Sequence, residues 1–444
     1  MNTRQYTVQF TESEQISIDY FLNNLHLNKA YNPENPGSPQ AAVELQEMKD
    51  RYLAYRTGWR GIPEEAIERG LHDEFYVQMK QPPQSIDVET SALCDLACPH
   101  CFRQYIATPD KMITEQLFRE VIDQAVDLGI PSLKLNWRGE PLMQPLLPRF
   151  IEYAKRKGML ETVINTNAVT LDAEKARALI EAGLDMMIYS FDGGTAETYD
   201  KMRVGRFKEN RFEDVYENIA RFHNIRKEIG SPFPRTRIQM VLTPETMGEV
   251  DEFRSRFTPI VDDVLVKAYE ERGLNLEVYT GEKRKMLLAK LSQRTKRKVN
   301  TIPQTMVWER TEGEFLLSTG RLPCQQLYQR LMVAYDGGVY MCCNDWGAEH
   351  PIGFVSGTGY EDGMKDYDSA FHRAQTNSKG FELLGNIQLP VRSNHPETKV
   401  STLEEIWDSV ELNQVRKSHI EGRVNDVSAC RKCTFMDTFK WEPL

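Results

Sequence analysis

The stretch TSALCDLACPHCFRQ, residues 90–104, places Cys94, Cys98 and Cys101 within eight residues. The whole chain of 444 residues has only eight cysteines, so this is a marked cluster. The stretch overlaps residues 84–90, QSIDVET, whose Ile, Val and Thr predict a short strand. Burial alone would scatter thiols along the chain. Their clustering at a strand end therefore indicates a common chemical role.

Outward from this stretch, strand-like runs alternate with longer runs of helical spacing as far as residue 270. The alternation predicts an α/β fold in which βα units build a parallel sheet. No dinucleotide-binding glycine fingerprint follows the first strand, so a partial (β/α)6 TIM-like barrel is favoured over a doubly wound sheet. The six expected strands lie within residues 84–90, 132–137, 161–167, 184–193, 235–243 and 261–270.

The sequence predicts three parts. Residues 1–83 form an N-terminal extension that packs on the barrel, and residues 84–300 form the barrel itself. Residues 315–444 form a small C-terminal α+β domain with a hairpin-like segment, MVAYDGGVYMCC, whose turn contains two glycines. An insertion at about residues 346–397 interrupts this domain, and STLEEIW then opens a capped helix.

The formal net charge is -10, with both signs spread along the chain, which argues against nucleic-acid and anionic-membrane partners. No apolar run approaches the length of a membrane span, and the N-terminus lacks an export pattern. We therefore expect a cytoplasmic protein whose thiols stay reduced. Clustered cysteines in that compartment indicate metal ligands or catalytic groups more than disulfides.

Three thiolates at this spacing can converge on one inorganic centre. Soft thiolates suit iron–sulfur clusters and zinc. Three ligands leave a fourth metal position without a protein partner, as is typical of reactive sites. A zinc site completed by His100 or by a distant residue is the alternative.

The pattern Cys94-x3-Cys98-x2-Cys101, in a loop after the first strand of a βα barrel, resembles the motif of the radical S-adenosylmethionine (SAM) superfamily. The resemblance implies that the three cysteines hold a [4Fe-4S] cluster whose open iron binds SAM. It implies that one-electron reduction cleaves SAM to a 5'-deoxyadenosyl radical, which abstracts hydrogen from the substrate. An electron donor such as flavodoxin or ferredoxin is then an expected partner.

The resemblance also implies SAM contacts at successive strand ends, where barrel enzymes build their sites. WRGEP, residues 137–141, resembles a Gly-Gly-Glu-Pro motif that meets the methionyl amine, with Arg138 in place of the first glycine. Taken singly, each candidate is an ordinary loop residue. The expected cofactor-binding residues are His100, Gly139, Glu140, Asn165, Asn167, Ser190, Asp192 and Arg203.

The C-terminal cysteines resemble the twitch form of the SPASM auxiliary domain. The resemblance implies one auxiliary [4Fe-4S] cluster held by Cys324, Cys342, Cys430 and Cys433. Zinc is the alternative there, because four thiolates satisfy it completely. The remaining Cys343 could replace Cys342 as ligand, be a buried structural residue, or return hydrogen to a substrate radical and so give epimerisation.

The expected substrate is a small polyhydroxylated molecule, a sugar or aminocyclitol, that undergoes dehydrogenation, dehydration or epimerisation. Besides Cys343, the candidate catalytic residues are Lys267, Tyr269 and Glu270, at the end of the last strand. A ribosomal-peptide maturase is the second hypothesis, and it would favour a peptide-docking winged-helix module at the N-terminus. A non-catalytic iron–sulfur carrier is the third, although a carrier would have no need of a SAM-binding barrel.

Overall fold

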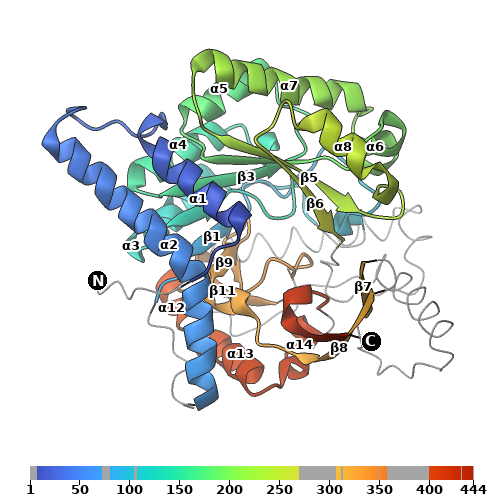
Figure 1. Cartoon of the computed structure of the whole chain (residues 1–444). Helices are drawn as coiled ribbons and strands as arrows, with labels where there is room; N and C mark the ends of the chain where they lie inside the picture. The colour runs from blue at the N-terminus through green and yellow to red at the C-terminus, as the bar shows by residue number, and fades with distance from the viewer. Residues whose placement is uncertain are drawn as a thin grey trace.

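The structure is a computed structural model of the 444-residue chain. It describes residues 8–72, 81–104, 108–269, 307–311, 314–348, 350–357, 400–431 and 433–443. Within them lie a large, mostly parallel sheet with its helices, a small C-terminal sheet, and two N-terminal helices (Figure 1).

The large sheet has nine strands in the order β11-β10-β9-β1-β2-β3-β4-β5-β6. Each of the six predicted strand ranges contains one of its strands, and neighbours from β1 to β6 are parallel. The six parallel strands follow one another in chain order, and the sheet does not close into a full barrel. The predicted α/β partial barrel is therefore confirmed. These strands are β1 (Ser85–Val88), β2 (Ser132–Lys134), β3 (Glu161–Thr166), β4 (Met186–Ser190), β5 (Arg235–Leu242) and β6 (Asp263–Ala268).

Helices connect the parallel strands, and local signals set their ends. Thr114 caps the first of them by accepting a hydrogen bond from the Leu117 N–H. Gly158, at φ 103°, ends the second in the left-handed region. Their apolar faces meet where Phe118 stacks on Phe150, with ring centroids 4.0 Å apart. The helices are α3 (Glu115–Asp127), α4 (Leu147–Lys157), α5 (Ala173–Glu181), α6 (Ala196–Met202), α7 (Phe212–Ile229) and α8 (Val250–Phe257).

The sheet continues on the other side of β1 with strands from the C-terminal part. β9 (Arg330–Val333) pairs parallel with β1, and β10 (Gly338–Tyr340) and β11 (Pro351–Phe354) follow in antiparallel fashion. β11 lies inside the predicted insertion, and residues 349 and 358–397 of that insertion lie outside the described residues. The predicted hairpin thus shares the barrel sheet and its core, which the sequence alone did not indicate.

The rest of the C-terminal part forms a three-stranded antiparallel sheet, in the order β12-β8-β7, and short helices (Figure 1). A capping box between Thr402 and Glu405 starts α12, as STLEEIW predicts. The elements are β7 (Val307–Thr311), β8 (Glu314–Arg321), β12 (Phe439–Pro443), α12 (Leu403–Trp407), α13 (Val410–Ile420) and α14 (Ser428–Arg431).

The N-terminal helices α1 (Glu12–Asn24) and α2 (Pro39–His72) pack where the parallel strands begin. Tyr52 and Tyr55 of α2 donate hydrogen bonds to Glu161 at the start of β3, at 3.2 and 2.9 Å. Asn28, after α1, donates to Asp185 just before β4 at 2.8 Å. These buried polar contacts and an aromatic cluster hold the extension on the barrel, at the end opposite to the cysteine loop.

Among the described residues, no helix combines the length and apolar character that crossing a membrane would require.

Candidate active site

The loop after β1 carries the three clustered cysteines and packs directly on the loop after β2. Gly139 permits this approach, because a Cβ atom there would lie 2.2 Å from the carbonyl oxygen of Ser91 and 2.6 Å from that of Leu93. The next residue, Glu140, donates its backbone N–H to the same Leu93 oxygen at 2.9 Å. Glycine is therefore required at position 139 for steric reasons.

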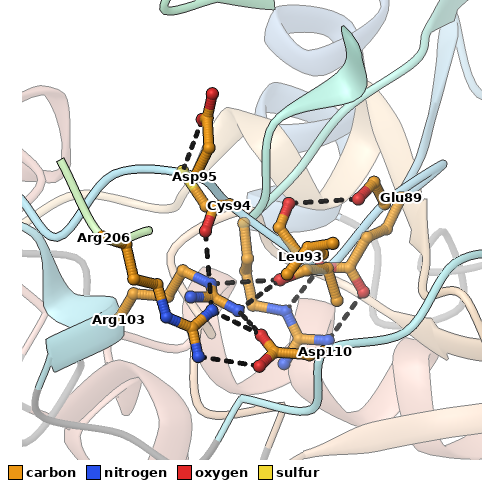
Figure 2. Close-up of polar contacts among 10 residues, drawn as sticks. Glu89, Leu93, Cys94, Asp95, Arg103, Asp110 and Arg206 are labelled. Atoms are coloured by element: carbon orange, nitrogen blue, oxygen red, sulfur yellow. Dashed lines mark hydrogen bonds and ion pairs between the residues drawn. The ribbon is translucent and has the colours of Figure 1, made fainter. Parts of the chain in front are cut away.

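An ionic clamp of Arg103, Asp110 and Arg206 holds the cysteine loop (Figure 2). Arg103 donates to the Ala92 carbonyl at 2.6 Å and to Asp110 at 2.8 Å. Arg206 donates to Asp110 through both terminal nitrogens, at 2.8 and 2.7 Å. Burial raises the pKa of Asp110, but the two arginines outweigh it and leave the pKa below its ordinary value. Sequence analysis missed this clamp, because no motif marks its members.

The side chain of Glu140 is buried after β2 and accepts three hydrogen bonds. The donors are the backbone N–H of Leu142 at 3.0 Å, the hydroxyl of Thr166 at 2.6 Å and the backbone N–H of Asn167 at 2.8 Å. Burial and the charge of Asp95 outweigh these donors and raise the pKa of Glu140 to about 8. A cation placed beside this buried carboxyl would stabilise its ionised form.

The two predicted asparagines at the end of β3 differ in their partners: Asn165 lies in the strand, and Asn167 follows it. Asn167 donates to Asp95 at 2.7 Å and accepts from the Val169 N–H at 3.0 Å, so it ties its loop to the cysteine loop. The side-chain oxygen of Asn165 is buried and has no hydrogen-bond partner among the described residues. Of the two predicted residues, Asn165 is thus the one with an atom available to a bound molecule.

Asp192, just after β4, is completely buried and pairs with two other predicted residues. Its Oδ2 lies 2.6 Å from Nη2 of Arg203 and 3.1 Å from Nε2 of His100, and its Oδ1 accepts from the Val241 N–H at 2.8 Å. Burial raises the pKa of Asp192, but Arg203 and His100 outweigh it, so the pKa lies below its ordinary value. Asp192 is therefore engaged with the side chains of Arg203 and His100.

The other predicted residues lie at the ends of β4 and β6. Ser190 is the last residue of β4, and its hydroxyl accepts a hydrogen bond from Gln239 at 3.3 Å. Lys267 lies in β6, and the hydroxyl of Tyr269, beyond that strand, donates to the backbone carbonyl of His100 at 3.3 Å. The contact brings the end of β6 to the cysteine loop. Glu270 lies outside the described residues.

Four of the C-terminal cysteines, Cys324, Cys342, Cys430 and Cys433, line one cavity. Burial raises the pKa of Cys324 to about 12 and also raises that of Cys430. Cys343 is not among the described residues that line the cavity. Three distant segments of the chain, before β9, after β10 and around α14, thus meet at this cavity.

Nitrogen donors surround the sulfur atoms of this cavity. The backbone N–H of Asn344 lies 3.3 Å from Sγ of Cys342, and that of Phe435 lies 3.5 Å from Sγ of Cys433. Nε2 of His419, a buried residue of α13, lies 3.3 Å from Sγ of Cys430. Burial lowers the pKa of His419 to about 4, so the imidazole is neutral at physiological pH. Sequence analysis missed His419, which has no motif around it.

The loop after β2 joins the two cysteine regions. Trp137 donates its indole N–H to the backbone carbonyl of Cys343 at 3.0 Å. Arg138 donates to the carbonyl of Trp346 at 3.3 Å and forms a fully buried ion pair with Glu89 at 2.7 Å. Position 138 has an arginine where the resembled motif has a glycine. The charge of this arginine is thus balanced by Glu89, an acidic residue directly after β1. The loop that contains Glu140 is thereby fixed to the segment with the C-terminal cysteines.

The segment from residue 88 to residue 257, which contains the cysteine loop and Glu140, matches the radical SAM superfamily. Residues 88–257 are a radical SAM domain. Proteins of this superfamily use a [4Fe-4S] cluster and SAM. The recognition of the three-cysteine motif in the sequence is confirmed.

Curated relatives align with parts of the chain. Fe-coproporphyrin III synthase from Methanosarcina barkeri is 38% identical over 112 residues, which are 25% of this chain and 27% of that protein. PqqA peptide cyclase from Rhizobium meliloti is 30% identical over 173 residues, which are 38% of this chain and 43% of that protein. The chain thus spans less than half the length of these relatives.

Solved structures resemble the chain at low sequence identity. BtrN in complex with AdoMet and 2-DOIA has a TM-score of 0.42 and 14% identity, covering 81% of this chain and 96% of that one. Streptococcus suis SuiB bound to the precursor peptide SuiA has a TM-score of 0.45 and 14% identity, covering 77% and 79%.

The donor set of the radical SAM domain fits an iron–sulfur cluster. Burial raises the pKa of Cys94 and raises that of Cys98 to about 12, while Arg203, whose Nη1 lies 4.0 Å from Sγ of Cys98, opposes the second shift. Both thiols are therefore protonated until a metal displaces the protons. Nδ1 of His100 and Nε of Arg203 are buried without a hydrogen-bond partner among the described residues and can serve a bound molecule.

The ligand geometry that zinc requires differs from that of a four-iron cluster. Within the described part of the chain, no three His, Cys, Asp or Glu side chains gather closely enough to hold one metal ion. A zinc ion needs its ligands within about 2.3 Å of a single point. A four-iron cluster takes one thiolate at each iron, so its ligand sulfurs lie farther apart.

Proposed function

We propose that this radical SAM enzyme oxidises a carbinol carbon of a small polyhydroxylated substrate, a sugar or aminocyclitol, and that an auxiliary cluster takes up one electron. The observation that carries the proposal is the cavity lined by Cys324, Cys342, Cys430 and Cys433. It offers the ligands of one additional [4Fe-4S] cluster, and the loop with Trp137 fixes it to the SAM-binding side of the barrel. An electron donor such as flavodoxin or ferredoxin and a cytoplasmic location belong to the same proposal.

When bound, SAM and a reduced cluster would supply a 5'-deoxyadenosyl radical able to take a hydrogen atom from the substrate. We assign Cys94, Cys98 and Cys101 to that cluster. Glu140 would accept a charge-assisted hydrogen bond from the methionyl ammonium. Arg203, held in place by Asp192, would direct its free Nε to the methionyl carboxylate.

His100, Asn165 and Ser190 are proposed to contact the adenosyl part. The backbone of His100 is held by Tyr269, and its Nδ1 is buried without a partner among the described residues. The unpaired side-chain oxygen of Asn165 is the corresponding acceptor. Gly139 would contribute by letting the two loops approach closely, and Asn167 by holding the side chain of Glu140 with its backbone N–H. Tyr269 and Lys267 would face the substrate, as would Glu270.

The pKa of Glu140 makes SAM binding depend on pH. Below about pH 8 the free protein carries a proton on Glu140, and the ammonium of SAM favours the ionised form, so binding releases that proton. We expect the SAM dissociation constant to fall by up to about tenfold per pH unit from about pH 6 to pH 8 and to level off above.

The variant Glu140→Gln should weaken SAM binding by about 1–3 kcal/mol, because a charge-assisted bond becomes neutral, and should flatten the pH profile. Anaerobic calorimetric titration between about pH 6 and pH 8 measures both effects. Glu152→Gln, on the exposed side of α4, is the control and should keep the parent profile. An unchanged profile in Glu140→Gln would remove Glu140 from the SAM site.

The proposed oxidation of the carbinol group removes one hydrogen atom, one proton and one electron. Removal of one hydrogen atom from the carbinol carbon leaves a substrate radical that still carries its hydroxyl group. Loss of the hydroxyl proton and of one electron then gives the carbonyl product. The proton would pass to solvent, and an auxiliary cluster held by Cys324, Cys342, Cys430 and Cys433 would supply the electron acceptor. Such clusters span a wide range of reduction potentials, which depend on hydrogen bonds to the sulfurs and on burial.

Cys343 decides between oxidation and epimerisation. Its thiol donates to Oε1 of Gln326 at 3.3 Å, and its carbonyl holds Trp137, which are structural contacts. We therefore expect Cys343→Ala to keep most of the activity and product formed in deuterium oxide to carry no solvent deuterium at the reacting carbon. Solvent deuterium there, with loss of product in Cys343→Ala, would show that the thiol returns hydrogen.

The substrate class is tested with sugars and aminocyclitols deuterated at single carbinol carbons. Mass spectrometry should find deuterium in 5'-deoxyadenosine for one labelled position and a carbonyl compound in equal amount. If no member of the panel increases 5'-deoxyadenosine formation above the substrate-free rate, the assigned substrate class is wrong.

A peptide-modifying enzyme is the second candidate, favoured by the relative named PqqA peptide cyclase. The described residues 8–72 contain helices and no strand, whereas a winged-helix docking module would need a β-wing. The N-terminal segment therefore favours the small substrate. Deuterium transfer from a labelled precursor peptide, but not from the polyol panel, would favour the peptide.

A further inference from the structure

His419 is the only histidine among the described residues that line the four-cysteine cavity. It is 1% exposed and comes from α13, which contributes none of the four cysteines. Its Nδ1 lies 3.2 Å from the backbone nitrogen of Cys324, and its Nε2 lies 3.3 Å from Sγ of Cys430. Both ring nitrogens thus face residues that we assign to the auxiliary cluster.

The hydrogen-bond network determines the tautomer of His419. A backbone N–H can only donate, so Nδ1 must accept from Cys324 and cannot carry a proton. The proton of the ring is therefore on Nε2. It points to Sγ of Cys430 and forms an N–H···S hydrogen bond.

This arrangement is the reverse of a metal-binding histidine. A histidine that ligates through Nε2 presents a lone pair there, and its protonated Nδ1 donates to an acceptor. In His419 the lone pair is on Nδ1, where the Cys324 N–H uses it. His419 is therefore built to donate to a cysteine ligand rather than to replace one.

We propose that His419 tunes the auxiliary cluster as an electron acceptor by donating an N–H···S hydrogen bond to Cys430. The inference rests on the proposed auxiliary cluster. Reduction adds negative charge to the cluster and its sulfur ligands, and hydrogen bonds to the sulfurs set its potential. Donation stabilises the reduced state and raises that potential. The backbone N–H groups at Cys342 and Cys433 act in the same direction and cannot be removed by substitution. The amide of Asn344, 3.9 Å from Sγ of Cys433, is a longer side-chain contact that stays in place in the His419 variants.

The test uses the full-length chain with Cys94, Cys98 and Cys101 replaced by alanine, so that the remaining signal comes from the auxiliary cluster alone. In this background His419→Phe removes both hydrogen bonds. His419→Gln keeps an amide N–H for Cys430 and an oxygen for the Cys324 N–H. Midpoint potentials are measured by redox titration followed by electron paramagnetic resonance, and iron is quantified in each variant.

For His419→Phe we expect the reduction equilibrium constant to fall about tenfold, a shift of about 59 mV to more negative potential for one electron. In His419→Gln much of this shift in potential should be absent. Both His419 variants should keep about four iron atoms per chain. His350→Phe is the control. The ring of His350 contacts Ser428 at 3.5 Å in the same part of the chain, and its loss should leave the potential unchanged.

Equal potentials in the parent background, His419→Phe and His350→Phe would overturn the tuning role. Loss of iron in both His419 variants, with retention in His350→Phe, would also overturn it by making His419 a ligand. Absence of any cluster from the triple-alanine background would instead refute the auxiliary cluster of the proposed function.

Discussion

Replacing Cys94, Cys98 and Cys101 together with alanine should halve the iron of the anaerobically reconstituted protein, from about eight atoms to about four, and abolish 5'-deoxyadenosine formation. Burial raises the pKa values of Cys94 and Cys98, so we expect these thiols to ionise when metal binds. Iron and sulfide analysis and chromatography of the nucleoside products measure the two effects.

The matched control replaces Cys324, Cys342, Cys430 and Cys433 with alanine, which should remove the other four irons and leave SAM cleavage possible. Cys343→Ala, in a cysteine that does not line the cavity, should retain about eight. Native protein that contains zinc without labile sulfide would contradict the C-terminal assignment. Full iron content in the first triple variant would contradict the assignment in the radical SAM domain.

Glu89→Gln should lower the free energy of unfolding by about 3–5 kcal/mol, because it leaves the Arg138 guanidinium buried without its counter-charge. Both side chains are completely buried, and their two contacts are 2.7 Å long. Since Arg138 also holds the Trp346 carbonyl, the variant should loosen the junction between the two cysteine regions. Urea denaturation of the reconstituted protein, followed by fluorescence, measures the change.

Two variants separate the effect of charge burial from a general effect of substitution. Glu228→Gln breaks an exposed ion pair with Arg177 and should cost at most about 1 kcal/mol. The double variant Glu89→Gln, Arg138→Met removes both charges and should recover much of the lost stability. If Glu89→Gln is no more destabilising than Glu228→Gln, the pair is not what holds this junction.

The sequence by itself determined the parallel sheet and the radical SAM domain. Strand and helix patterns are local, since they depend on side-chain periodicity and on capping residues such as Thr114. The cysteine motif is equally local, because its three cysteines lie within eight residues. WRGEP was recognisable for the same reason, with the required glycine and the acidic residue side by side.

Only the tertiary structure decided what depends on contacts between distant residues. Position 138 has an arginine where the resembled motif has a glycine. The buried partner of this arginine, Glu89, lies 49 residues earlier in the chain. The clamp at Asp110 and the donor His419 likewise follow from chain segments meeting in space, and no local pattern marks them. The placement of β9 beside β1 is of the same kind. Side-chain periodicity shows that a strand has a buried face, but its neighbour is decided by how the whole core packs.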